Sequence, residues 1–193
     1  MPKKRNFLGH VVFFVKWYYT VMDIISHGLY GGIAFGRKSK MTFWIAFFFG
    51  VAPDLFSFGI FFMQRLFTTG FDMSHSGPPD IATIPAYVSS MYNITHSLVV
   101  FLLVFGLVWI VTKRPQHLML GWPLHILVDI PTHSNKFFPT PFLWPLSDFH
   151  VNGISWGHWF IFFPNVALLI VLYSWFYLTK KSPKEKPRNT CPF

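Results

Sequence analysis

Residues 41–63 read MTFWIAFFFGVAPDLFSFGIFFM, an apolar run of 23 residues whose only formal charge is Asp54. At 1.5 Å per residue, a helix of this length reaches about 34 Å, which is enough to cross the hydrocarbon core of a bilayer. We therefore expect a membrane-spanning helix here, with a carboxylate inside it.

The rest of the chain is similarly apolar. Of its 193 residues, 52% are hydrophobic and 12% are charged, whereas about 25% of the residues in a soluble domain are charged. Further apolar stretches cover residues 94–111 and 154–178, a shorter one covers 117–130, and an interrupted one covers 7–36. We expect an all-α, polytopic helical membrane protein with four or five membrane segments and an N-terminal interfacial helix.

Composition divides the chain into three parts. We expect an N-terminal basic, interfacial segment at residues 1–20, a helical membrane domain at residues 21–179 and a disordered basic tail at residues 180–193. The one cysteine, Cys191, lies in this tail. It cannot form an internal disulfide, and a cysteine-based zinc site is excluded.

The net charge of +9 comes from basic residues that lie between the apolar runs. This placement favours lipid headgroups over nucleic acid as partners, together with a small-molecule or lipid substrate. Basic groups at residues 37–40, 113–114 and 180–188 are separated by even numbers of expected crossings, which predicts a cytoplasmic C-terminal tail in an inner or plasma membrane. The basic residues 3–5 disagree with this count, so the topology of the N-terminus stays open.

Ionisable residues inside apolar stretches are the strongest functional signal. Three carboxylates occur there, Asp23, Asp54 and Asp129, and each unpaired one would oppose insertion by about 2.5 to 3.5 kcal/mol. The central spans contain no lysine or arginine to neutralise them. A divalent metal would do so, and it would also use nearby histidines as ligands.

Depth supports a shared site. Counted along each expected helix from its basic flank, five residues fall between about 15 and 26 Å, at or beyond the membrane midplane; they are His27, Asp54, His96, His125 and Asp129. His125 and Asp129 are four residues apart and share a helix face. We predict these five as metal ligands near the non-cytoplasmic side.

Other interpretations of these residues stay open. Asp23 precedes His27 by four residues and either orients its ring or binds the ion as well. A lone membrane histidine is most often a packing or hydrogen-bonding residue. Asp54 follows Pro53 and could cap a helix break, and Asp129 lies close to a proline that could end its helix. Three imidazoles with two carboxylates favour zinc, with manganese or iron as alternatives.

Four short motifs occur in order along residues 23–147: His27, then Ala52-Pro53-Asp54, then Thr95-His96-Ser97, then His125 and Asp129 followed by Pro131-Thr132 and Leu143-Trp144-Pro145-Leu146. In this order they resemble the predicted membrane-bound metal-dependent hydrolases of bacteria and archaea. The resemblance implies a small helical membrane protein with a His/Asp metal centre, similar in ligand types to zinc phospholipases C and related nucleases.

Two positions depart from the pattern that this resemblance implies. Phe56 stands where a second aspartate is expected after Asp54, and His133-Ser134 replaces the turn after Pro-Thr. Both departures argue against a second metal, although His133 could substitute as a ligand.

We expect a membrane-embedded metal-dependent hydrolase that acts on a phosphoester or lipid-linked ester through a metal-bound hydroxide. Asp54 is the candidate general base with one ion, or a bridge with two. Arg65 and Lys136 are candidate phosphate contacts, or plain interfacial anchors. Trp144, Trp156 and Trp159 fit an interfacial aromatic belt.

The alternatives are an ion- or proton-coupled transporter and a non-catalytic membrane scaffold that use the same cluster. A transporter needs polar residues that continue to the cytoplasmic side. Residues 41–49 and 101–111 are nearly devoid of them, which favours a blind pocket over a pathway.

Overall fold

The computed structural model describes residues 23–68 and 81–179, so the predicted interfacial segment and basic tail lie outside the described residues. The first described element is a helix over residues 23–35. The others are α2 (Lys40–Thr68), η1 (Ile81–Thr83), α3 (Ala86–Thr95), α4 (Leu98–Thr112), η2 (His117–Leu120), α5 (Gly121–Thr132) and α6 (Trp159–Thr179). This part of the chain holds one isolated bridge, Ser134 with Phe137, and no strand. The all-α prediction is confirmed there.

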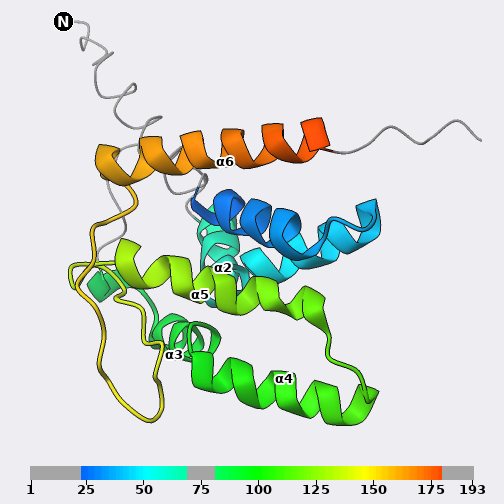
Figure 1. Ribbon diagram of the computed structural model, residues 1–193. Coiled ribbons are helices and arrows are strands. Elements are labelled where there is room, and N and C mark those ends of the chain that lie inside the picture. The colour runs from blue at the N-terminus through cyan, green and yellow to red at the C-terminus, as the bar shows by residue number, and fades with distance from the viewer. Residues whose placement is uncertain (1–22, 69–80, 180–193) are drawn as a thin grey trace, which may run out of the picture.

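In Figure 1, α6, the helix over residues 23–35, α5 and α4 run roughly parallel to one another. α2 packs against α3, α5 and η2. The yellow loop between α5 and α6 closes one end of this arrangement. The predicted ligands come from the helix over residues 23–35, from α2, from the end of α3 and from α5.

Within residues 23–68 and 81–179, fewer helices qualify as membrane spans than expected. α2 and α6 are long and apolar enough to cross a membrane, and α3 with α4 would make a third span, bent by 61°, if the pair is one. Four or five segments were predicted because short apolar runs were counted. α5 has only 12 residues, well below the roughly 20 that a bilayer requires.

α6 also begins later than the predicted apolar stretch. That stretch starts at residue 154, whereas α6 starts at Trp159. Residues 154–158 belong to the loop, where the backbone N–H groups of Gly153 and Ile154 donate to the carbonyl oxygens of His133 and Pro131 over 2.8 and 2.9 Å. These bonds hold the loop against the end of α5.

The break between α3 and α4 has a local cause. Ser97 is extended, with φ −99° and ψ 123°, and its side chain accepts a hydrogen bond from the backbone N–H of Val100 over 3.1 Å. Serine at this position satisfies one of the free N–H groups at the start of a helix. The preceding residue, His96, therefore sits at the corner between two helices, with its ring fully buried.

Glycines bring three helices into backbone contact. A Cβ atom added to Gly50 of α2 would lie 2.4 Å from the carbonyl oxygen of His27, and one added to Gly121 of α5 would lie 2.6 Å from that of Ala46. Membrane helices use small residues in this way because lipid provides no hydrophobic force between them. The close approach brings the helix over residues 23–35 and α5 within side-chain reach across α2.

α6 is attached through hydrogen bonds within the apolar interior. Asn165 of α6 accepts a hydrogen bond from the Tyr30 hydroxyl over 2.6 Å and donates one to the Ser26 hydroxyl over 2.9 Å. The Tyr173 hydroxyl donates to the carbonyl oxygen of Leu29 over 3.0 Å. These bonds fix α6 against the helix that carries His27.

Candidate metal centre

The structure brings all five predicted ligands into one buried cluster, together with two more residues. We name this group the His/Asp cluster: Asp23, His27, Asp54, His96, His125, Asp129 and His133. The side chains of His27, His96, His125 and Asp129 are at most 1% exposed. Four separate segments supply the cluster, so tertiary packing creates it.

Asp129 is the centre of the cluster. Its Oδ1 atom lies 2.9 Å from Nε2 of His27 and 3.6 Å from Nδ1 of His133. Its Oδ2 atom lies 3.0 Å from Nε2 of His125 and 3.4 Å from Nε2 of His96. One buried carboxylate therefore faces four imidazoles, two through each oxygen.

The orientation of His125 follows from its backbone contact. Nδ1 of His125 lies 2.7 Å from the carbonyl oxygen of Gly50, and a carbonyl can only accept, so Nδ1 carries the hydrogen. In the neutral ring Nε2 then holds a lone pair that is directed into the cluster. Metal-binding histidines are typically fixed in this way, with the second ring nitrogen donating to a carbonyl or carboxylate.

His96 is held in the same manner. Its Nδ1 atom lies 3.2 Å from the carbonyl oxygen of Tyr92 and 3.0 Å from the Thr95 hydroxyl. Nε2 of His96 consequently faces Nε2 of His125 at 3.1 Å. Two lone pairs at this distance repel each other unless a proton or a metal ion lies between or beside them. A metal ion would do this without protonating either ring.

Four donor atoms of the cluster lie close together: Nε2 of His96, Nε2 of His125, Oδ1 of Asp54 and Oδ2 of Asp129. The separations that involve an imidazole nitrogen are 3.0, 3.1, 3.4, 3.4 and 3.9 Å. Ligands bound to tetrahedral zinc at 2.0 to 2.1 Å are about 3.3 Å apart. These five separations are therefore of the size expected when such donors share one metal ion.

Several cluster atoms have no hydrogen-bond partner among the described residues. They are both carboxylate oxygens of Asp129, both ring nitrogens of His27, Oδ1 of Asp23 and Nδ1 of His133. Buried polar atoms without partners are costly, and a buried carboxylate is the costliest of them. Groups such as His27, His125 and Asp129, or Asp54, His96 and His125, could hold a metal ion. The identity of the metal stays a prediction.

Asp23 and His133, predicted only as supporting residues or extra ligands, lie at the edge of the cluster. Oδ1 of Asp23 is 3.1 Å from Nε2 of His27. The side chains of Asp23 and His133 are 15% and 19% exposed. The position after Pro-Thr, which departs from the expected motif, thus contributes an imidazole to the cluster.

Neither of the predicted phosphate contacts is a member of the His/Asp cluster as defined above. Arg65, in the last turn of α2, has its guanidinium carbon 5.9 Å from the ring centroid of Phe61. Lys136 is exposed on the loop after α5. Their contact with substrate stays a prediction.

Two aromatic residues at the cluster were missed from the sequence. Trp156, predicted to lie in an interfacial belt, is only 8% exposed, and its ring meets that of His27 edge-on at 5.4 Å. Its Nε1 atom is buried with no hydrogen-bond partner among the described residues. Tyr92 stacks on His96 with ring centroids 3.8 Å apart. No sequence pattern separates these two from the chain's many other aromatic residues.

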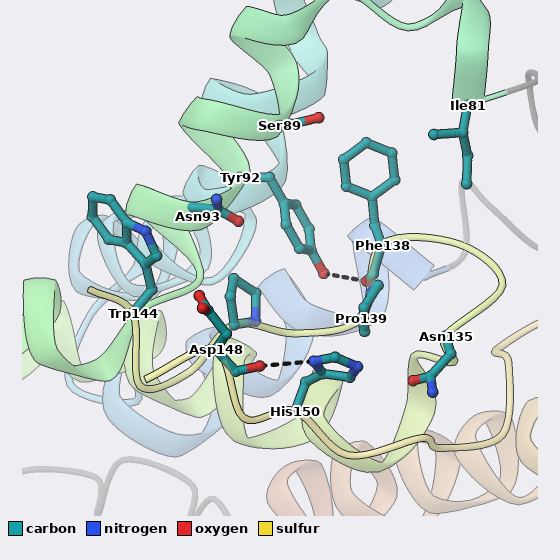
Figure 2. A pocket seen from close by; sticks show the side chains of 11 residues that line it. Ile81, Ser89, Tyr92, Asn93, Asn135, Phe138, Pro139, Trp144, Asp148 and His150 are labelled. Atoms are coloured by element: carbon teal, nitrogen blue, oxygen red, sulfur yellow. Dashed lines mark hydrogen bonds between the residues drawn. The ribbon is translucent and has the colours of Figure 1, made fainter. Parts of the chain in front are cut away.

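A cavity of about 340 Å³ is lined by no residue of the His/Asp cluster itself but by its neighbour Tyr92, with Asn93, Asn135, Trp144, Asp148 and His150 among the others. Figure 2 shows the Tyr92 hydroxyl directed at the carbonyl oxygen of Phe138, to which it donates over 2.9 Å. Because Tyr92 both lines the cavity and stacks on His96, one aromatic ring connects the two.

Comparison of the chain with protein-family models, with curated proteins and with solved structures finds no match in any of the three. The resemblance to membrane-bound hydrolases therefore stays an expectation from the motifs.

Proposed function

We propose that this chain is a membrane-embedded, metal-dependent hydrolase that cleaves a phosphoester or lipid-linked ester. The observation that carries the proposal is the pair His96 and His125, whose Nε2 atoms face each other at 3.1 Å while the backbone fixes both Nδ1 atoms. Zinc is the favoured ion, with manganese or iron as alternatives.

A bound divalent ion would activate a water molecule near neutral pH and polarise the ester oxygen. His96, His125 and Asp129 would hold the ion, since their donor atoms are buried and mutually close. Gly50 and Tyr92 would keep the two rings in place through their carbonyl oxygens. The chain thus supplies a preorganised binding site, with no rearrangement of these side chains needed.

Asp54 is the candidate general base. Its side chain is 12% exposed, and its contacts with His96 and His125, at 3.4 and 3.9 Å, both use Oδ1. Oδ2 takes no part in these two contacts and is the oxygen we assign to proton transfer. In hydrolysis the water oxygen bonds to phosphorus or to the acyl carbon, the ester bond breaks, and Asp54 passes the water proton to the departing alcohol.

The setting fits a substrate that reaches the site from the membrane or its surface. α2 and α6 are long and apolar enough to cross a bilayer, and the cavity beside Tyr92 is lined by α3 and the loop after α5. We place this end of the bundle on the non-cytoplasmic side, from the positions of the basic residues. A transporter is disfavoured because α4 reads LVVFLLVFGLVWIVT, without an ionisable residue.

The test uses the full chain purified in detergent. We expect stoichiometric metal by elemental analysis, together with hydrolysis of p-nitrophenyl phosphate, bis(p-nitrophenyl) phosphate or a p-nitrophenyl ester. His125→Ala should lose both, and His117→Ala should keep both, since His117 is exposed on η2. Equal metal content in all three proteins would refute the proposed metal centre. Bound metal without hydrolysis of any of these esters would refute the proposed hydrolase activity.

A further inference from the structure

The His/Asp cluster has more donors than one ion can use. A catalytic tetrahedral ion typically takes three protein ligands and one water molecule, and His96, His125, Asp54 and Oδ2 of Asp129 already provide four donors. Nε2 of His27, Nδ1 of His133 and Oδ1 of both Asp23 and Asp129 remain, all buried and each within 3.6 Å of another atom of this remaining set.

These remaining atoms are also close to one another. Oδ1 of Asp129 lies 2.9 Å from Nε2 of His27 and 3.6 Å from Nδ1 of His133, and Nε2 of His27 lies 3.1 Å from Oδ1 of Asp23. These three separations are similar to the 3.0 to 3.9 Å found around the first set of donors. The side chain of His27 is only 1% exposed, so solvent does not satisfy its ring nitrogens.

His125 cannot serve both sets. It belongs to a possible ligand group with His27 and Asp129 and to another with Asp54 and His96. However, its Nδ1–H donates to the carbonyl oxygen of Gly50, so Nε2 offers a single lone pair. Asp129 has two oxygens and can bridge. A second ion therefore needs Asp23 or His133 to complete its ligands beside His27.

Charge gives a second argument, which rests on the phosphoester substrate of the proposed function. The cluster holds three carboxylates, Asp23, Asp54 and Asp129, and its neutral imidazoles add no charge. With one divalent ion the net charge is −1, and with two it is +1. A site in low dielectric that is to receive a phosphate anion needs a net positive charge, because a net negative charge would repel the anion.

We infer that the His/Asp cluster binds two divalent ions bridged by the carboxylate of Asp129, one held by Asp54, His96 and His125 and the other by Asp23, His27 and His133, and that its substrate is an anionic phosphoester. Two adjacent ions suit such a substrate, because they can bind both the attacking and the departing oxygen. The substrate class and the charge argument rest on the proposed function, whereas the number and position of the donor atoms support two ions without it.

The number of ions is measured without any activity. The detergent-purified full chain is stripped with chelator and dialysed against Mn²⁺, and the metal per chain is determined by mass spectrometry. Two ions per wild-type chain are expected, with an exchange-coupled electron paramagnetic resonance spectrum. One ion per chain with an uncoupled six-line spectrum in the wild type would overturn the proposal, whatever the variants do.

Variants assign the two positions. His133→Ala should retain one ion and lose the exchange coupling. Asp23→Asn should weaken the binding of the ion that His133→Ala loses. His117→Ala, outside the cluster, should bind two. Retention of two coupled ions by His133→Ala would contradict the assignment of His133. Size-exclusion chromatography and circular dichroism check folding, and His133→Gln replaces the alanine variant if that one misfolds.

Inorganic phosphate is the probe for the substrate class. We expect it to bind the two-ion wild type at least about tenfold more tightly than the one-ion His133→Ala protein, as seen by calorimetry. Equal affinities would overturn the phosphoester assignment. Two bound ions without ester hydrolysis would support the two-ion site and refute the proposed function. One bound ion with ester hydrolysis would refute the two-ion site and support the proposed function.

Discussion

The carbonyl oxygen of Gly50 lies 2.7 Å from Nδ1 of His125 and accepts its hydrogen bond. The same glycine is the point at which α2 meets the helix over residues 23–35, where an added Cβ would come within 2.4 Å of the His27 carbonyl oxygen. Gly50 therefore positions two imidazoles at once. Its carbonyl orients His125, and its missing side chain admits the backbone that carries His27.

Gly50→Ala should therefore damage both packing and the cluster. The added methyl group meets backbone rather than a flexible side chain, so the helices must separate, at a cost of about 1 to 3 kcal/mol in unfolding free energy. Metal content should fall with it. Gly106→Ala in α4 is the matched control, because no heavy atom lies within 4 Å of the added Cβ. Denaturation in mixed micelles and elemental analysis measure both effects, and equal behaviour of the two variants would contradict this account.

The apolar stretches predicted the helices better than they predicted the spans. The run at residues 41–63 became α2, Lys40–Thr68, with Asp54 inside it. The run at residues 117–130 became η2 and α5, a short pair that packs against α2. Hydrophobicity alone does not distinguish a short helix buried among other helices from one that faces lipid, so the segment count was too high.

The cluster was accessible from the sequence because charge in an apolar segment is an energetic problem that can be seen without a structure. His27, Asp54, His96, His125 and Asp129 were all found in this way, and all five meet. The orienting carbonyl of Gly50 and the indole of Trp156 were not found. Both contacts depend on which backbone atoms and ring faces of different helices meet. The types of the residues and their spacing along the chain do not reveal such contacts.

Removal of the metal should destabilise the fold. Without an ion, the carboxylates of Asp23, Asp54 and Asp129 remain buried near one another. A ligand at 100 times its Kd contributes about 2.7 kcal/mol to stability, so chelator should lower the thermal midpoint measurably and zinc should restore it. His117→Ala should respond as the wild type does. Asp129→Asn should respond little, and a midpoint insensitive to chelator in the wild type would show that no ion stabilises this protein.

The bond between Tyr30 and Asn165 should contribute measurably to the attachment of α6. The Tyr30 hydroxyl donates to Oδ1 of Asn165 over 2.6 Å, and Asn165 is 8% exposed. Double-mutant cycles of such bonds in membrane proteins average about 0.6 kcal/mol and reach about 1.7. We expect a coupling of about 1 kcal/mol between Tyr30→Phe and Asn165→Ala in detergent unfolding. Strict additivity of the two losses would mean that the bond does not hold α6.

Trp156 should affect turnover without affecting the metal. Its indole N–H is buried beside His27 and has no partner among the described residues, so a bound substrate oxygen is the natural acceptor. Trp156→Phe keeps an aromatic ring against His27 and removes the donor. Metal content and stability should stay near wild type, because the donor that is lost makes no hydrogen bond there, whereas kcat should fall by about 10²-fold, as when a single transition-state donor is removed. Trp159→Phe is the control, since Trp159 is 64% exposed at the start of α6. A Trp156→Phe protein with reduced metal content would instead make the indole a packing support for His27, and full activity would exclude contact between the indole and the substrate.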